Sequence, residues 1–466
     1  MLQALLNVFR IPELRNKLLF TIAMLAIYRI GFWIPLSGVD QSKLASFFEA
    51  RDSGAAQKLA QYISTFTGGD LGQSTIFGLG VMPYISAAII FQLLASAWEP
   101  LKKLQKEGPS GRQKIQEWTR YATIGLCILQ GFGWLTYMQT QGLIYPGITE
   151  NPGLLWSFRI QGVVALVAGT TFLMWLGEQI DKYGLGNGVS LIITAGILAQ
   201  MPNAIITVVS DFSLDATSNA TYGPLSVIFL VCAFVAVTAG AIVITVAQRR
   251  IPIQQAKHTR GRKVYGGQKA FLPLRINHGG VMPIIFAQSL MIFPSVGLSS
   301  LAQASQGTDM TWWGRTTDFL GRSMSMGNYP YVVLEILLIY FFSYFWTTVQ
   351  FNPKEMSEQL RNHGSFIPGL RPGPRTAEYL ETVLERVTYV GAGFLAIIAV
   401  IPTVVAVGLK IPFVVSSFLG GTGLLIVVSV GLDFVQRIEA NLLMRNYAGF
   451  LGGGGSGDRI RSSRGA

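Results

Sequence analysis

Long apolar stretches, separated by polar segments, dominate the pattern along the chain. Each is close to the roughly 20 apolar residues that an α-helix needs to cross a bilayer. They occupy residues 18–36, 76–97, 121–138, 158–177, 189–209, 225–247, 279–298, 330–349, 387–408 and 411–434. A water-soluble core needs no such repetition of long apolar runs. The pattern predicts an all-α polytopic membrane protein with ten transmembrane helices.

Composition supports this class of protein. Of the 466 residues, 13% are charged, against about 25% in soluble domains. The N-terminal segment MLQALLNVFRIPELRNK is typical of a short amphipathic helix, and no small-residue cleavage site follows the first apolar run. We therefore expect that run to remain as a helix. Cys127 and Cys232 lie inside apolar stretches, which favours packing over disulfide formation or metal binding.

The net charge of +12 is unevenly distributed over the two sides of this topology. With the N-terminus in the cytoplasm, ten spans return the C-terminus to the same side. The cytoplasmic segments then carry 28 Lys and Arg residues and the opposite segments carry seven. The positive-inside rule supports this orientation. Most of the basic residues are thereby explained as topology signals.

Two of the cytoplasmic segments, 248–275 and 351–380, are too long to be simple connectors. Both mix basic residues with Gly, Pro and aromatic residues. Such composition suits docking of a large partner, including one that contains nucleic acid. A solvated basic loop is an equally good interpretation of composition alone.

No arrangement of residues typical of catalysis is found. The three histidines fall in or beside cytoplasmic loops, and the HExxH, GxSxG and phosphate-binding GK[ST] patterns are absent from the sequence. The charges within the apolar stretches, Arg29, Glu335 and Asp433, lie toward the ends of their helices. This argues against a membrane enzyme and against an ion relay. We expect no enzymatic activity and no cofactor, and keep a secondary transporter for a small solute as the alternative function.

One region interrupts the simple pattern. A short apolar piece, LAQYISTF at 59–66, and the glycine-rich FTGGDLGQ at 66–73 precede the second apolar stretch, in which Pro83 stands near the start. The short piece cannot cross a bilayer, and its residues alone favour a helix in an external loop. Pro83 is expected to disturb the hydrogen bonding of the helix that follows.

Several motifs, in order along residues 1–450, resemble those of the SecY family, the central subunit of the bacterial protein-translocation channel. They are YRIGFWIPLSGVD (28–40), GLGVMPYISAAIIFQLL (78–94), GLGNGVSLII (184–193), the segment 249–290 that begins RRIPIQQAKHTRGRKVYGG, FNPKEMSEQLRNHGSFIPGLRPGPRTAEYL (351–380) and GGTGLLIVVSVGLDF (421–435). The glycine-rich tail alone departs clearly from the family.

The resemblance implies two pseudo-symmetric five-helix halves around a central pore, over residues 1–210 and 220–436, followed by a cytoplasmic tail (437–466) that is flexible from about 450. Inverted repeats of this kind are common where a membrane protein opens between two halves. The piece before the second helix, about 59–75, would be a plug that blocks the closed pore. Its hinge would be Gly68, Gly69 and Gly72.

The resemblance also implies a ring of aliphatic side chains that constricts the pore. A narrow apolar constriction resists ion leakage without binding polar side chains of a passing chain. Carried over by motif, the ring consists of Val81, Ile85, Ile193, Ile285 and Ile426, with Ile89, Val189 and Leu424 as further candidates. Position 81 holds Val where the family pattern has Ile.

A lateral gate is implied between 76–97 and 279–298, through which apolar segments would leave into lipid. The polar residues expected near this seam are Ser86, Gln92, Asn277 and Gln288. Hydrogen bonding between helices of the closed protein is the alternative role for these side chains, and the sequence does not separate the two.

The resemblance gives the basic loops their expected partners, the SecA motor and the ribosome, at Arg262, Lys263 and Arg371. It implies no cofactor. Further expected partners are SecE-like and SecG-like small membrane subunits, secretory and membrane precursor polypeptides, and membrane lipid. The expected location is the bacterial inner membrane, with both termini cytoplasmic.

Overall fold

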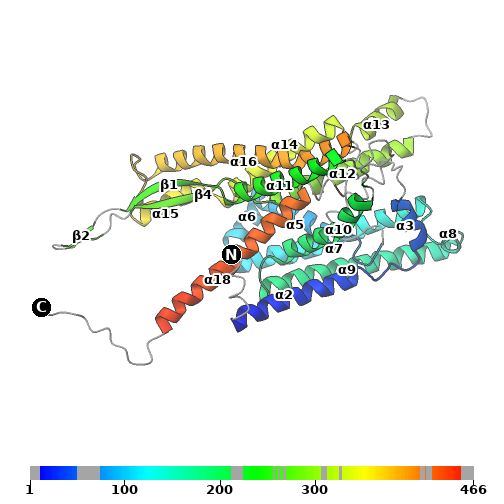
Figure 1. Ribbon diagram of the computed structural model, residues 1–466, viewed down its shortest axis with the longest axis horizontal. Coiled ribbons are helices and arrows are strands. Elements are labelled where there is room, and N and C mark those ends of the chain that lie inside the picture. The colour runs from blue at the N-terminus through cyan, green and yellow to red at the C-terminus, as the bar shows by residue number, and fades with distance from the viewer. Residues whose placement is uncertain are drawn as a thin grey trace.

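The computed structural model describes residues 11–49, 74–210, 212, 224–255, 258–260, 263–265, 269–305, 312–324, 328–409, 415 and 422–452. The long helices run side by side along the long axis of the molecule (Figure 1). The helices are α2 (Pro12–Gly31), α3 (Gln41–Glu49), α5 (Met82–Ala97), α6 (Glu99–Lys106), α7 (Pro109–Thr140), α8 (Pro146–Thr149), α9 (Pro152–Tyr183), α10 (Gly188–Ser210), α11 (Pro224–Val246), α12 (Met282–Ser305), α13 (Trp312–Ser323), α14 (Tyr329–Gln350), α15 (Pro353–Asn362), α16 (Pro374–Leu409) and α18 (Thr422–Gly452).

Each of the ten predicted apolar stretches overlaps one long helix: α2, α5, α7, α9, α10, α11, α12, α14, α16 or α18. Among the described residues, five helices are both long and apolar enough to cross a membrane. They lie in 152–183, 188–210, 226–246, 329–362 and 374–405, and α5 with α6, bent by 101° at their junction, would make a sixth. Charged residues near the helix ends lower the mean hydropathy of others, as in α2, which contains Glu13, Arg15, Lys17 and Arg29.

Pro83 does not disturb a helix, contrary to the expectation from its place in an apolar stretch. It lies in the first turn of α5, which begins at Met82. Backbone N–H groups of a first turn have no partner within the helix, so a proline there costs no hydrogen bond. The proline therefore marks where the spanning helix starts, partway along the apolar stretch 76–97.

The segment 74–81 leads into α5 and is held on two sides. Its backbone pairs with the chain after α2: Leu36 N donates to Ser74 O at 2.9 Å, and Ile76 N donates to Ile34 O at 3.1 Å. On the other side it approaches α9 so closely that a Cβ on Gly169 would lie 2.3 Å from Ile76 O. A glycine in α9 is thus required for this segment to pack where it does.

Gly169→Ala is expected to lower the free energy of unfolding by about 1–3 kcal/mol, because the backbone of Ile76 cannot move aside as a flexible side chain would. Thermal unfolding of the purified protein in detergent measures the change. Gly125→Ala is the matched control, since a Cβ on this glycine of α7 meets nothing within 4 Å. Equal stability of the two variants would contradict the close approach.

The two long basic segments form β-structure, which the sequence did not predict. Strands β1 (Gln248–Gln255), β4 (Lys269–Arg275) and β5 (Ser365–Phe366) make one antiparallel sheet in the order β4-β1-β5. β2 (His258–Arg260) pairs with β3 (Lys263–Tyr265) in a hairpin that extends away from the helices (Figure 1). Because β1 pairs with β5, the segments 248–275 and 351–380 are parts of one unit, called the basic sheet below.

The basic sheet is fixed to the helices by a hydrophobic cluster of its own. Ile251 of β1 and Leu274 of β4 pack with Ile367, which follows β5. Leu380 and Leu384, in the first turns of α16, complete the contact. A larger cluster lies at the centre of the helices and draws on α5, α10, α12, α14, α16 and α18.

Candidate functional site

The five residues predicted as a ring lie together in the central cluster, although they come from segments spread over 345 residue positions, from 81 to 426. Val81 immediately precedes α5, and Ile85 is in its first turns. Ile193 is in α10, Ile285 in α12 and Ile426 in α18. All five are at most 7% exposed. The structure thus brings these side chains together from four helices.

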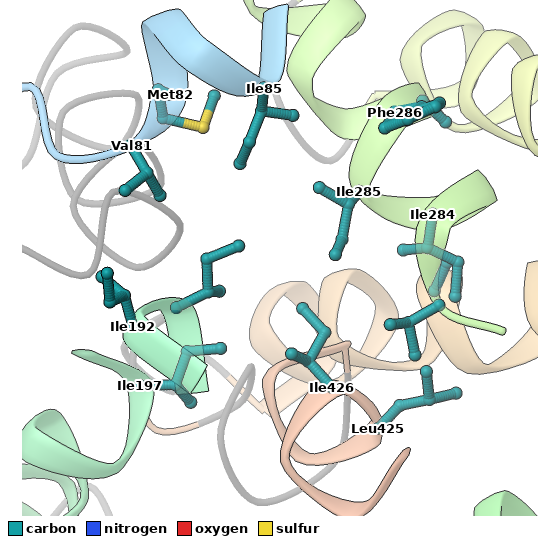
Figure 2. Packing of buried hydrophobic residues seen from close by; sticks show 14 of the residues in the cluster. Val81, Met82, Ile85, Ile192, Ile197, Ile284, Ile285, Phe286, Leu425 and Ile426 are labelled. Carbon is teal, nitrogen blue, oxygen red and sulfur yellow. The ribbon is translucent and has the colours of Figure 1, made fainter. Parts of the chain in front are cut away.

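Figure 2 shows how the helices present these residues. Ile85, Ile285 and Ile426 extend toward one shared space from three different ribbons. On α12, Ile285 points into this space, whereas Ile284 and Phe286 lie on the opposite side of the helix. These side chains point in different directions because a helix has 3.6 residues per turn. Residues that follow one another in sequence therefore lie on different faces of α12.

The further candidates also lie in or against this cluster. Ile89 and Leu424 are buried members of it, and Val189 packs against it partly buried. Val189, Ile193 and Ile197 follow at i, i+4 and i+8 on α10, as Val81, Ile85 and Ile89 do on α5. The same spacing could have identified Ile197, a buried member of the cluster that the sequence analysis did not name.

A cavity of about 310 Å³ adjoins the ring. Its walls include Val281 and Met282, just before Ile285 on α12, and Ser429 and Val430, one turn after Ile426 on α18. Arg275, the last residue of β4, also lines it. The cavity therefore lies between the aliphatic ring and the basic sheet, and we call it the vestibule.

The vestibule contains polar and charged side chains, which the ring lacks, and its charges are partly neutralised. Arg437 forms an ion pair with Asp433 on α18, with 2.8 Å between Nε and Oδ2. Arg275 donates from Nη2 to Gln436 Oε1 at 3.3 Å. Burial, reinforced by the charge of Arg275, lowers the pKa of His278 to about 4, so this side chain is neutral at neutral pH.

The residues predicted for a lateral gate are only partly brought together. α5 and α12 are in contact, and Ser86 is buried on α5. Gln288, however, donates to Glu335 Oε1 of α14 at 3.3 Å, so its hydrogen bond lies within the α12–α14 pair. Asn277 donates to Gly280 O at 2.8 Å in the turn before α12. For these two side chains the structure thus shows hydrogen bonds within the protein.

The side chain of Glu335, placed by sequence near the start of its helix, is buried, with 2% exposure for the residue. Its pairing with Gln288 was not predicted, since the two residues are 47 positions apart. The remaining gate candidate, Gln92, is half-buried on α5. Arg29, expected toward the end of its helix, lies in the last turn of α2, where it is exposed and its guanidinium carbon is 5.9 Å from the ring centroid of Phe32.

The predicted docking residues belong to the basic sheet. Arg371 is exposed in the turn between β5 and α16. Lys263 begins β3, in the hairpin that extends from the sheet, and Arg262 lies outside the described residues. The plug segment 59–75 is described only at Ser74 and Thr75, and its hinge glycines 68, 69 and 72 also lie outside the described part of the chain.

Most of the chain is similar in sequence to one protein family. The family model for SecY matches residues 75–435, which include the ring, the basic sheet and most of the residues that line the vestibule. The chain belongs to the SecY family. The protein translocase subunit SecY of Chlamydia trachomatis serovar D is 39% identical over 453 residues, covering 96% of this chain and 97% of the relative. That of Escherichia coli K12 is 40% identical over 444 residues, covering 94% of each.

Solved structures share the fold of this SecY-family chain. One, described as the structure of a protein conducting channel, aligns with a TM-score of 0.60 at 17% identity, covering 93% of this chain and 94% of the other. Sec61 in the canine ribosome-channel complex from the endoplasmic reticulum aligns with a TM-score of 0.57 at 16% identity, with the same coverage. The described chain thus has the fold of these membrane channels.

Proposed function

We propose that this protein is the channel subunit of a protein translocase. It passes unfolded secretory polypeptides across the membrane and releases transmembrane segments sideways into lipid. The observation that carries the proposal is the convergence of Val81, Ile85, Ile193, Ile285 and Ile426 from four helices beside a polar vestibule. An extended chain would pass from the vestibule through this ring.

The aliphatic nature of the ring suits a substrate with every kind of side chain. Isoleucine and valine offer no hydrogen bond that would hold one polar residue longer than another, and they yield to bulky groups by changing rotamers. When no polypeptide is present, hydrocarbon side chains at a narrow point exclude hydrated ions. The segment 59–75 would add a plug on the side of the ring opposite the vestibule.

Lateral release would take place between α5 and α12, which are in contact in this structure. An apolar segment that leaves the vestibule gains roughly 25 cal/mol for each Å² of apolar surface removed from water. The halves 1–210 and 220–436 would separate at this seam. Ser86 and Gln92, on α5, are the polar side chains that would face it.

The basic sheet would receive the partners that supply energy, a SecA-type motor or the ribosome. Its joined segments place Arg371 and the β2–β3 hairpin on one unit, which supports a single docking surface. SecE-like and SecG-like subunits would complete the complex. The protein is thus a channel rather than an enzyme, located in the bacterial inner membrane with both termini in the cytoplasm, as the distribution of basic residues favours.

A photo-reactive residue at position 85 tests the proposal. In lipid vesicles that contain the purified complex, a secretory precursor is stalled midway, and a crosslink from position 85 is expected that depends on SecA and ATP. The control position is Ile144, which is equally inaccessible but belongs to a separate cluster, and no crosslink is expected there. Transport without any crosslink at 85 would overturn the pore assignment. Uptake of a small solute without polypeptide transport would favour the secondary transporter.

A further inference from the structure

Arg159 of α9 lies in an unusual setting on the outward face of the helices. Its guanidinium carbon is 5.5 Å from the ring centroid of Phe132 on α7 and 5.4 Å from that of Trp156 on α9. Both distances are within the range of cation–π attraction. Nη2 donates to Oε1 of Gln139 at 2.5 Å. Two aromatic rings and one amide thus hold the guanidinium in a fixed position.

The two aromatic rings face away from the protein core. Phe132 is 42% exposed and Trp156 is 57% exposed, whereas Leu135, on the inner side of α7, is fully buried. Gly162 lets α9 approach α7 here, because a Cβ on it would lie 2.7 Å from Leu135. The two helices are therefore in close contact, and the cradle around Arg159 opens toward the surroundings of the helices.

The depth of this cradle matches the boundary of the apolar part of the membrane. Gln139 follows the apolar stretch 121–138, and Arg159 is at the start of the stretch 158–177. Arg159 is seven residues from the first residue of α9, roughly 10 Å along the helix axis. This end of α9, next to α8, is remote from the basic sheet (Figure 1). Tryptophan is enriched at this depth, where lipid phosphates also lie.

The charge of Arg159 is not neutralised within the described part of the chain. The structure records no ion pair between it and a described carboxylate, and its Nε is buried without a hydrogen-bond partner there. The remaining donors of the terminal nitrogens are the groups that a ligand would contact. A simple surface anchor would extend its side chain into water, whereas the guanidinium carbon of Arg159 stays within 5.5 Å of two ring centroids.

We propose that Arg159, Phe132, Trp156 and Gln139 form a binding site for the phosphate of an anionic phospholipid, in the leaflet remote from the basic sheet. Arginine pairs with phosphate through parallel N–H groups of its planar guanidinium, and the two rings with Gln139 hold that group in place. An acyl chain would lie along the exposed apolar face of α9, where Ile160 is 62% exposed. The positive charge favours an anionic lipid over a zwitterionic one.

Native mass spectrometry of the purified complex, titrated with phosphatidylglycerol, tests this site. Arg159→Gln is expected to weaken one bound phosphatidylglycerol about tenfold, as the loss of a charge-assisted contact would. Arg29→Gln is the matched control, because Arg29 is at the same end of the molecule but contacts a single ring. Its lipid binding should equal that of the unmodified protein. Unchanged lipid binding in Arg159→Gln would overturn the proposal.

Two further measurements distinguish an anionic lipid from a zwitterionic lipid and from free phosphate as the ligand. Phosphatidylcholine is expected to bind this site more weakly, and equal binding would overturn the preference for an anionic lipid. Inorganic phosphate in the same titration should not displace the lipid, and full displacement would assign the site to free phosphate instead. If Arg159→Gln does not assemble, Trp156→Leu keeps the charge and removes one ring. This variant is expected to bind the lipid about threefold more weakly, and undiminished binding would count against the cradle.

Discussion

Ile85→Asn is expected to turn the closed protein into an ion leak. In the structure Ile85 is buried among aliphatic side chains from three other helices. An asparagine there would place an amide in the proposed constriction and stabilise water within it. Hydrating one such group removes a barrier of about 1–3 kcal/mol, which corresponds to a rise in ion flux of about fivefold to 150-fold. Flux across vesicles that contain the purified complex, without any precursor, measures this.

The control variant Ile144→Asn distinguishes loss of the barrier to ions from a general loss of stability. Ile144 is as inaccessible as Ile85 but packs in a different cluster, with Leu36, Val39 and Leu143. This variant should lose a comparable amount of thermal stability and show no leak. If both variants leak equally, the flux reports loosened packing and the aliphatic ring has no special role.

Arg371→Glu is expected to reduce motor-driven transport at least about tenfold while leaving the protein assembled, because reversing a charge at a docking surface replaces attraction by repulsion. The turn that carries Arg371 is held by its backbone: Thr376 Oγ1 donates to Arg371 O at 2.9 Å, and Ser357 Oγ donates to Gly373 O at 2.7 Å. Neither bond involves the side chain that is changed. ATP-dependent uptake of a precursor into vesicles measures the effect.

Arg361→Glu makes the same change of charge on α15, where the side chain is also exposed. Transport should fall much less in this control, since the turn between β5 and α16 is the part proposed to contact the motor. Equal losses would mean that the total charge of the basic sheet matters and the position does not. Full transport by Arg371→Glu would contradict the docking assignment.

The helices of this protein could be predicted from the sequence because membrane-spanning helices are specified locally. Roughly 20 apolar residues in a row satisfy their own backbone hydrogen bonds and need no knowledge of a partner. The first residue of a helix is predicted less accurately than the presence of the helix. Hydropathy predicts one helix over 76–97, whereas α5 begins at Met82, residues 74–76 pair with the chain after α2, and residues 76–81 form turns. Hydropathy does not distinguish a buried irregular segment from a helix.

The ring residues were named through their motifs, and their meeting in one cluster depends on the tertiary structure. Ile193 and Ile285 have no local feature that distinguishes them from the other isoleucines of the same helices. The basic sheet was missed for a related reason. β1 pairs with β4 and with β5, which is more than 100 residues away in the sequence, and short strands rich in Arg, Gln and Pro carry a weak local signal.

The sequence by itself determined that this is a membrane protein of many helices and which family its motifs resemble. These properties follow from composition and from patterns within about 30 residues. Only the tertiary structure decided that Gln288 bonds to Glu335, that two distant loops form one sheet, and that Phe132 and Trp156 enclose Arg159. Each of these contacts depends on which faces of two helices or strands meet, and that choice is made by packing over the whole molecule.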